Sequence, residues 1–277
     1  MRPLSALTAD DVAPIAGVVF DLDDTLLDHG RLAEAAYGAL FRLREAGLRL
    51  VGATGRPYGW IDVLARQWPV DAMIAENGAA AVVATSEGKL RTLLAQGDRS
   101  RADLLALAEH LVARFPSAKI TGDNAARVAD VTIDIGETCR VPAADVRAMC
   151  EIARAAGVVT ITSSVHLHLS HETPDKAAGA VWVLGEAFGE DPTAALRRYA
   201  FIGDSGNDAA AFAAFKLTFG VANVRASAPL LTLMPRFVAP STMGRGFVEI
   251  AAALIALRST SGNLTRSTSG DLARSSG

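Results

Sequence analysis

Cysteine and aromatic residues are scarce in this sequence of 277 residues. The chain has two cysteines, Cys139 and Cys150. These are too few for the disulfide framework of a small secreted domain, so we expect a reducing, cytoplasmic setting. Aromatic residues make up 6% of the chain, although half of all residues are hydrophobic. That balance favours an α/β protein rich in Ala, Val and Leu, with one large domain or two smaller ones.

Long apolar runs and basic runs are also missing. No stretch approaches the roughly 20 apolar residues that a membrane helix needs. The segment MRPLSALTADDVAPIAG lacks the apolar centre of a signal peptide. Lys and Arg number 27 against 30 Asp and Glu, which gives a formal charge of −3. We therefore expect neither a membrane nor nucleic acid as a partner, and the sequence leaves the oligomeric state open.

The order of apolar patterns along the chain indicates its domains. Short β-branched runs alternate with amphipathic stretches over 13–80 and again over 172–257, which predicts a core domain with a mostly parallel, doubly wound sheet. The rhythm changes over 81–171, where helices and alternating strands predict an inserted α+β domain. Residues 258–277 repeat Arg-Ser-Thr-Ser-Gly and are almost devoid of apolar residues, so we predict a disordered tail.

Acidic residues follow the first apolar strand directly, in the segment VVFDLDDTLLD. If the chain stays extended there, Asp21, Asp23 and Thr25 face one space beyond the carboxyl end of a parallel strand, where ligands of such sheets bind. Crowded carboxylates repel one another, and Mg²⁺, which prefers oxygen ligands, removes that penalty. The alternative is that these acids are turn formers or helix caps, and we prefer it for Asp28.

A second strand also ends in acids, in the segment FIGDSGND. Asp204 and Asp208 follow this strand, and Gly203 and Gly206 allow the loop backbone to approach a ligand closely. Asn207 or Asp208 could instead cap the next helix. Two acid-tipped strands in one chain favour a shared metal site over two coincidental caps.

Two further segments supply groups that bind phosphate. In VGATGRP, the hydroxyl of Thr54 and the backbone N–H groups around Gly55 and Arg56 could form a small cradle, although Thr-Gly is also an ordinary turn. Lys176, one of only four lysines, stands at a helix start, where the helix dipole disfavours cations. A nearby anion explains it, and a solvated surface lysine is the alternative. Together these groups indicate phosphoryl transfer.

At this point the sequence resembles the haloacid dehalogenase (HAD) superfamily. Its four motifs occur in order as DLDDT, ATGR, Lys176 and GDSGND, and the resemblance extends from Val18 to Leu257. The insertion is similar to the large α/β cap of subclass IIB, which includes Cof-type, sucrose-phosphate and mannosyl-3-phosphoglycerate phosphatases. The segments AENGA (75–79) and GVANV (220–224) strengthen the similarity. The resemblance implies a Rossmann-like core with an inserted cap.

The resemblance also implies the roles of the acids in a Mg²⁺-dependent phosphatase. Asp21 would attack phosphorus and form an aspartyl-phosphate, and Asp23 would act as general acid and then general base. The metal would be held by the Asp21 side chain, the Asp23 carbonyl and Asp204, with Asp208 in support.

The same resemblance implies a small phosphorylated metabolite, such as a sugar phosphate, as the substrate. Thr54 and Lys176 would hold the phosphoryl oxygens, and residues near the cap would contact the leaving group. The residues expected to bind substrate are Thr54, Gly55, Arg56, Asn77, His166 and His168.

Three other functions stay open from the sequence. His166, His168 and His171 have the spacing His-x-His-x-x-His, which could bind zinc for a different hydrolase, but could equally line the cleft or face solvent. A phosphotransferase or mutase would use the same aspartyl-phosphate and pass the group to a sugar hydroxyl. A non-catalytic phosphate-binding protein could keep the fold, although the presence of both Asp21 and Asp23 disfavours it.

Overall fold

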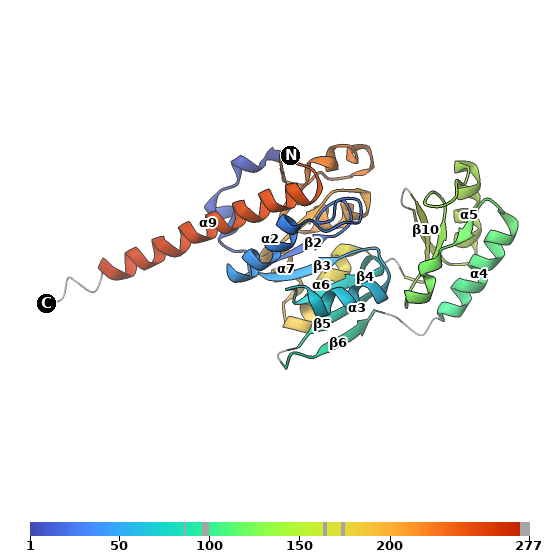
Figure 1. Ribbon diagram of the computed structural model, residues 1–277, viewed down its shortest axis with the longest axis horizontal. Coiled ribbons are helices and arrows are strands. Elements are labelled where there is room, and N and C mark those ends of the chain that lie inside the picture. Colours follow the sequence, from blue (N-terminus) through green and yellow to red (C-terminus); the bar gives the residue numbers. More distant parts are fainter. Residues whose placement is uncertain (86, 96–99, 163–164, 173–174, 272–277) are drawn as a thin grey trace. The chain divides into compact units, whose positions relative to one another are not determined.

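The computed structural model describes residues 1–85, 87–95, 100–162, 165–172 and 175–271 (Figure 1). The chain divides into two compact units. The first comprises Met1–Ala53, Trp68–Ala72 and Ala180–Gly277, and the second comprises Thr54–Gln67 and Met73–Gly179.

The first unit contains a sheet whose strands run in the order β1-β13-β12-β11-β2-β3. Every neighbouring pair in this run is parallel. The strands β2, β11 and β12 are buried along their whole length, which explains why the sequence shows continuous apolar runs here rather than alternation. The strands are β1 (Arg2–Pro3), β2 (Gly17–Asp21), β3 (Arg49–Ala53), β11 (Tyr199–Gly203), β12 (Leu217–Gly220) and β13 (Phe237–Val238).

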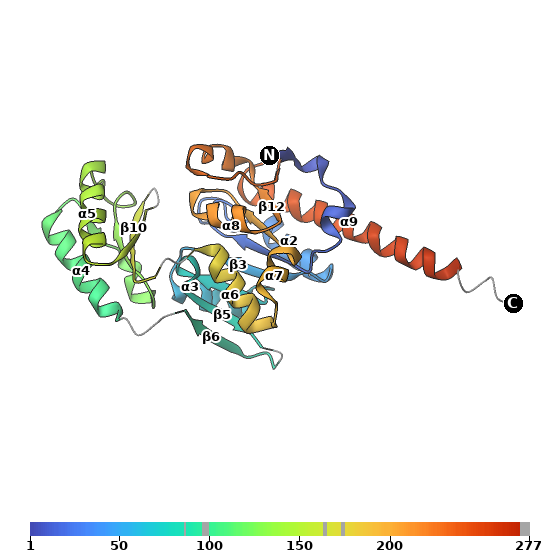
Figure 2. The ribbon, with the colours of Figure 1, turned by 180° about the vertical axis from the view of Figure 1, so that it is seen from behind.

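Helices cover both faces of this sheet. Figures 1 and 2 show α2 and α9 on one face and α7 and α8 on the other. α9 packs against α2 and α1, and its Phe247 meets Phe20 of β2 edge to face, with ring centroids 5.4 Å apart. The helices are α1 (Ala9–Val12), α2 (Glu34–Glu45), α6 (Lys176–Phe188), α7 (Pro192–Arg198), α8 (Ala209–Ala214) and α9 (Met243–Asp271).

The second unit contains α3, three strands in the order β4-β5-β6, and a separate antiparallel sheet in the order β7-β8-β10-β9. Figure 1 shows α4 and α5 on one face of this small sheet. Its elements are α3 (Tyr58–Gln67), β4 (Ala72–Ala75), β5 (Ala80–Ala84), β6 (Leu90–Leu94), α4 (Arg101–Arg114), β7 (Lys119–Ile120), β8 (Val131–Asp134), α5 (Ala143–Ala155), β9 (Val159–Thr162) and β10 (His166–Ser170).

Strand alternation separates the two faces of the small sheet. Leu167 and Leu169 of β10 pack with Val131 and Ile133 of β8 in the core beneath α4 and α5. The intervening residues, among them His168, point to the opposite face, because successive side chains of a strand alternate.

The predicted fold class is confirmed: a mostly parallel, doubly wound sheet is combined with an α+β segment. Within the described residues, no helix has both the length and the apolar character needed to cross a membrane. Short 3-10 helices complete the structure: Leu4–Ala6, Glu76–Gly78, Gly122–Ala126, Gly206–Asp208, Ala222–Arg225 and Ala228–Leu230.

The last helix overlaps the segment that we predicted as a tail. α9 continues to Asp271 and thus includes residues 258–271, for which we predicted disorder. Residues 272–277 lie outside the described residues.

Candidate active site

The acids lie where the order of the parallel strands reverses. From β2 the chain proceeds to β3 on one side, whereas β11 on the other side leads outward to β12 and β13. Such a switch point leaves a crevice at the carboxyl ends of the strands. Asp21 is the last residue of β2. Phe20 pairs with Ile202 of β11, so Asp21 at the end of β2 and Asp204, the residue after β11, lie at the same edge of the sheet.

Three of the predicted acids come together in the first unit. Asp21, Asp204 and Asp208 are buried, and each offers a carboxylate oxygen within 4.8 Å of those of the other two. At that separation two negative charges repel by roughly 3 kcal/mol per pair, taking the effective dielectric constant of a protein. Buried carboxylate oxygens at this spacing fit a hard divalent cation such as Mg²⁺. No other group of three His, Cys, Asp or Glu in the described ranges has this geometry.

Backbone donors fix Asp208 in this cluster. Its Oδ2 accepts hydrogen bonds from the N–H groups of Asp204 (2.8 Å) and Ser205 (3.1 Å). Together with the Ser205 side chain it forms a capping box for the turn Gly206–Asp208. A Cβ at Gly203 would collide with the Asp208 carboxylate, so glycine is required there. Asp208 therefore caps this turn and also belongs to the acid cluster. The cap and the metal-site interpretations of this residue are thus compatible.

Asn223 and Thr25 hold Asp204 from the other side. Asn223 Nδ2 donates to Asp204 Oδ2 at 2.7 Å, and the Thr25 hydroxyl donates to Asp204 Oδ1 at 3.3 Å. Asn223 Oδ1 in turn accepts the N–H of Met243. Sequence reasoning assigned no role to Asn223. The signal was present, because Asn223 lies in the segment GVANV.

The first acidic segment is not extended as predicted. The strand ends at Asp21, and the carbonyl of Leu22 accepts the N–H groups of Thr25, Leu26 and Leu27. Asp24 adopts a left-handed conformation with φ of 56°, which reverses the chain. Thr25 still reaches Asp204, but through this turn. Asp23, two residues beyond the strand, is half-buried.

Asp28 has a structural role, as we preferred, but its carboxylate contacts a different helix from the one expected. α2 begins at Glu34 with Ala33 as its cap, so Asp28 does not cap that helix. Its Oδ1 instead accepts the N–H of Gly244 at 2.8 Å, in the first turn of α9.

The second unit holds the predicted phosphate turn. Thr54 is buried, its hydroxyl accepts the N–H of Arg56 at 3.1 Å, and its carbonyl accepts the N–H of Asn77. The Asn77 side chain lies against Gly55, where an added Cβ would meet its Oδ1 at 3.0 Å. Thr54, Gly55, Arg56 and Asn77 are thus brought together. Thr54 follows Ala53, which pairs with Asp21 in the neighbouring strand.

Lys176 begins α6 and is fully buried, so it is not the solvated surface lysine of the alternative interpretation. Its helix start packs closely on the turn that carries Asn77. A Cβ at Gly78, whose φ is 118°, would lie 2.5 Å from the carbonyl oxygen of Asp175 and 3.2 Å from Cα of Gly179. Lys176 is therefore held beside the phosphate turn through this glycine contact.

Glu76 is a second residue that the sequence did not single out. It is fully buried, and its carboxylate accepts four backbone N–H groups at 2.7–3.0 Å, from Tyr58, Val128, Ala129 and Asp130. Burial, with the charge of Asp130, raises the pKa of Glu76, and these hydrogen bonds oppose that rise. Glu76 thus ties the segment 128–130 to the turn that begins α3.

The three histidines do not form a metal site. His166 Nε2 pairs with Glu137 at 2.8 Å, His168 Nδ1 with Asp130 at 2.8 Å, and His171 Nε2 with the carbonyl of Ser100 at 2.9 Å. Their separate partners leave the zinc alternative without support among the described residues.

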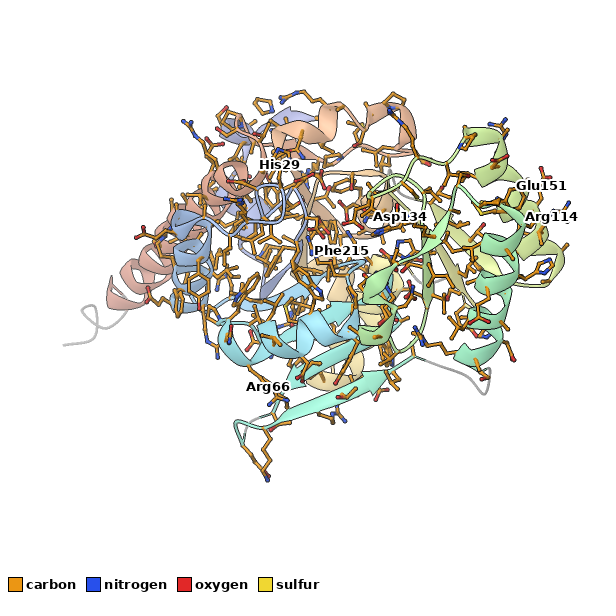
Figure 3. All side chains as sticks on the ribbon, turned by 45° about the vertical axis from the view of Figure 1, so that its right-hand side comes forward. His29, Arg66, Arg114, Asp134, Glu151 and Phe215 are labelled. Carbon is orange, nitrogen blue, oxygen red and sulfur yellow. The ribbon has the colours of Figure 1, made fainter. Side chains whose placement is uncertain are left out.

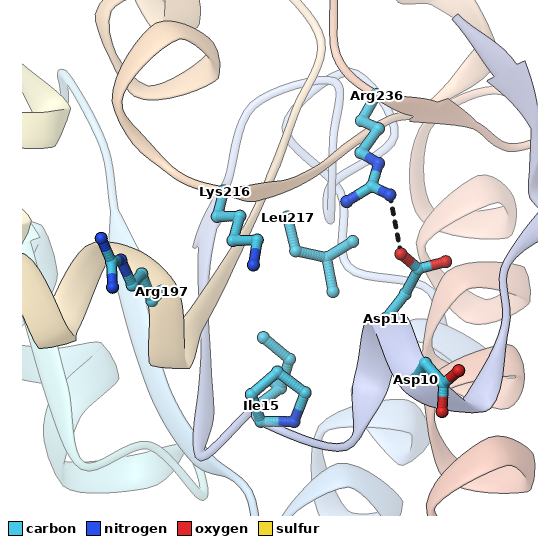
Figure 4. A pocket seen from close by; sticks show the side chains of 8 residues that line it. Asp10, Asp11, Ile15, Arg197, Lys216, Leu217 and Arg236 are labelled. Atoms are coloured by element: carbon cyan, nitrogen blue, oxygen red, sulfur yellow. Dashed lines mark hydrogen bonds and ion pairs between the residues drawn. The ribbon is translucent and has the colours of Figure 1, made fainter.

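A pocket of about 140 Å³ lies elsewhere in the first unit (Figure 4). Arg236 pairs with Asp11 at 2.8 Å in its wall. Lys216 and Arg236 directly precede β12 and β13, so the pocket lies at the amino ends of these strands, whereas the acid cluster follows carboxyl ends. It contains none of the predicted site residues.

The chain is similar to a known protein family and to several solved structures. Residues 18–109 match the sequence model of a family described as haloacid dehalogenase-like hydrolase. No curated protein matches the sequence.

Solved structures share the fold along most of the chain. Protein 0175 of Thermoplasma acidophilum is 20% identical, with a TM-score of 0.69 over 87% of this chain and 98% of that chain. A HAD-superfamily phosphatase from Bacteroides thetaiotaomicron is 17% identical, with a TM-score of 0.61 over 88% and 96%. A sugar phosphatase of HAD subclass IIB is 15% identical, with a TM-score of 0.57 over 81% and 93%. The resemblance to the HAD superfamily is therefore confirmed by the family match over residues 18–109, and the solved structures share the fold over most of the chain.

Proposed function

We propose that this protein is a Mg²⁺-dependent phosphomonoester hydrolase that acts through an aspartyl-phosphate on Asp21. The observation that carries the proposal is the buried cluster of Asp21, Asp204 and Asp208. The family match and the phosphatases among the structural neighbours support the same class of reaction.

Mg²⁺ would be held by Asp21, Asp204 and the backbone carbonyl of Asp23, with Asp208 in support. When bound, the ion offsets the repulsion among the carboxylates and the charge on the phosphoryl oxygens. Asn223 and Thr25 keep the Asp204 carboxylate in one orientation, and such supporting hydrogen bonds commonly tune metal affinity.

The chain's own acids account for the two chemical steps. A carboxylate oxygen of Asp21 attacks phosphorus while the bond to the leaving oxygen breaks, and Asp23 gives that oxygen its proton. Asp23, now ionised, takes a proton from water as the water oxygen attacks the phosphorus of the aspartyl-phosphate. The bond to Asp21 then breaks, which releases phosphate and restores both acids.

Thr54 and Lys176 would hold the phosphoryl oxygens. Both are buried in the second unit, so their donors would act with little competition from water. The start of α6 lies against Gly78, the residue after Asn77, and this contact supports the assignment.

The substrate would be a sugar phosphate or a related small metabolite. One neighbour of the same fold is described as a sugar phosphatase. The insertion 81–171 would act as a cap that excludes water from the first step. Arg56, Asn77, His166 and His168 would contact the leaving group.

A panel of phosphorylated sugars with Mg²⁺, each measured against Asp21→Asn, tests the proposal. We expect free phosphate to appear in proportion to the substrate lost, and no turnover by Asp21→Asn. Substrate loss without free phosphate, with the group recovered on a second sugar, would instead establish a phosphotransferase or mutase. Turnover by Asp21→Asn at the wild-type rate would overturn the proposal.

A further inference from the structure

A continuous chain of hydrogen bonds in the second unit leads from the phosphate turn to His168. Arg127 Nη1 donates to the carbonyl of Gly55 at 3.3 Å and to the Asp130 carboxylate at 2.9 Å. The Asp130 carboxylate then meets His168 Nδ1 at 2.8 Å. Gly55 directly follows Thr54, so this chain begins beside a predicted phosphate ligand.

The Arg127 guanidinium is fully engaged within the protein. Its side chain is 2% exposed, and its other terminal nitrogen donates to Asp123 at 2.9 Å. Two carboxylates and a carbonyl thus surround it, which is the pairing that a buried guanidinium requires. Arg127 is therefore a structural link between segments rather than a group available to a ligand.

Asp130 sets the orientation of the histidine. Its side chain is 2% exposed. Burial alone would raise its pKa, but hydrogen bonds and charge from His168 and Arg127 outweigh burial, and the pKa is lowered. An ionised carboxylate only accepts hydrogen bonds, so Nδ1 of His168 must carry a proton. Nε2 is then the ring nitrogen left for another partner.

The Nε2 atom of His168 reaches accessible space. The His168 side chain is 7% exposed, and its only hydrogen bond within the described chain uses Nδ1. No described side-chain nitrogen or oxygen is fully enclosed without a partner, so Nε2 touches solvent. It lies on the face of the small sheet opposite α4 and α5.

Glu76 fixes this arrangement relative to the phosphate turn. The same Oε2 accepts the N–H groups of Ala129 (2.7 Å) and Asp130 (2.9 Å), while Oε1 accepts that of Tyr58. The backbone of Asp130 is therefore tied to the segment that immediately follows Arg56.

We propose that Arg127 and Asp130 are positioning residues that hold the His168 imidazole at a fixed place relative to the phosphate turn, so that Nε2 binds a polar oxygen of the leaving group. This inference rests on the proposed function and narrows its substrate class. The favoured phosphoesters carry a hydroxyl oxygen on the leaving group, because an unprotonated Nε2 can only accept a hydrogen bond. An aryl phosphate whose leaving group lacks such an oxygen is not bound more tightly through His168.

The acids around Arg127 provide a matched pair of variants. Asp130 and Asp123 both pair with Arg127, but only Asp130 meets His168. We expect Asp130→Asn to raise KM for the best hexose phosphate about 3- to 10-fold, the worth of one hydrogen bond, with KM for p-nitrophenyl phosphate changed less than about 2-fold. Asp123→Asn should leave both constants within about 2-fold.

Non-additivity separates positioning from a general loss of structure. If Asp130 acts through His168, the double variant with His168→Gln has the same KM for the hexose phosphate as His168→Gln alone. Additive effects, or an equal rise in KM for both esters, would overturn the proposal. His168→Gln also serves if Asp130→Asn does not fold, because it must show the same selective rise in KM.

Nitrogen-15 NMR of His168 at pH 8 tests the orientation without any substrate. We expect the Nδ1-protonated tautomer in the wild-type protein and in Asp123→Asn. Asp130→Asn should shift the ring to the Nε2-protonated form, because an amide can donate to Nδ1. An unchanged tautomer in Asp130→Asn contradicts the positioning role. A wild-type protein that releases no phosphate from any ester contradicts the proposed function instead, and the NMR result then still decides the orientation.

Discussion

The side-chain amide of Asn223 donates a hydrogen bond of 2.7 Å to the Asp204 carboxylate and one of 2.9 Å to the backbone carbonyl of Asp24. Asn223, three residues beyond the end of β12, therefore links the two segments of the first unit in which acids follow a strand. Its carbonyl oxygen is fixed by the N–H of Met243 at 3.1 Å, so the amide has a single orientation. Asn223 orients a proposed metal ligand without being an acid itself.

Replacing Asn223 by Ala should weaken the proposed metal site. Asp204 would lose the hydrogen bond from the Asn223 amide, and groups that orient metal ligands are worth about 10- to 100-fold in affinity. We expect the Mg²⁺ concentration for half-maximal phosphatase activity to rise at least about 10-fold. Asn207→Ala is the control, because within the described part of the chain the Asn207 side chain accepts a hydrogen bond from the Ser205 hydroxyl and bonds to none of the three acids. An equal change in both variants would argue against this role for Asn223.

The proposed nucleophile can be separated from its acidic neighbours. Asp21→Asn keeps the shape of the side chain but removes the charge that attacks phosphorus, so kcat should fall at least about 10³-fold. Asp24→Asn removes a carboxylate three residues away and retains a residue type that tolerates the left-handed conformation there. It should stay within about 3-fold of wild type. If kcat fell to a similar extent in both variants, the result would contradict the assignment of Asp21 as the nucleophile.

Local sequence patterns were sufficient to predict the sheet, the α+β segment and the acid cluster. Asp21 and Asp204 could be predicted because both follow buried apolar strands, and parallel strands bring their carboxyl ends to one edge. The strand register then aligns the two strand ends: Phe20 pairs with Ile202, Asp21 directly follows Phe20, and Asp204 comes two residues after Ile202.

Other features depend on contacts that no local pattern encodes. Glu76 binds segment 128–130, more than fifty residues away, and its partners are backbone N–H groups that carry no sequence signature. The turn after β2 needed the left-handed conformation of Asp24, which the acidic composition did not reveal.

Two glycines with left-handed backbones test how Lys176 is positioned. Gly78→Ala would place a methyl group against the carbonyl of Asp175, whereas Gly88→Ala meets nothing within 4 Å. Both variants bear the backbone strain, about 1–3 kcal/mol, but only Gly78→Ala also disturbs the start of α6. We expect a larger loss of stability in urea and a lower kcat/KM for Gly78→Ala alone. Equal behaviour of the two would show that the close contact at Gly78 is unimportant.

Asp134 at the end of β8 (Figure 3) predicts a specific dependence of stability on pH. Burial alone would raise its pKa, but hydrogen bonds from the Thr138 hydroxyl and from the N–H groups of Gly136, Glu137 and Thr138 hold the pKa well below its usual range. A depressed pKa stabilises the fold at pH values above the ordinary value of 3.8. That stabilisation is lost as the pH falls further, towards the pKa of the folded state.

Asp134→Asn should therefore lower the free energy of unfolding by about 2 kcal/mol at pH 7. The difference from wild type should shrink as the pH falls below about 4. Urea unfolding at several pH values measures this, with the exposed Glu137→Gln as the control for a lost charge. A deficit that is the same at pH 3 and pH 7 would mean that the ionised carboxylate is not the source of the stability.

The response of phosphate release to divalent ions is the most direct test of the acid cluster. The wild-type protein is assayed with p-nitrophenyl phosphate after treatment with EDTA and again after Mg²⁺ is restored in excess. Because three buried carboxylates share one small space, we predict that activity disappears with EDTA and returns with Mg²⁺. Turnover that continues undiminished in EDTA would contradict the account.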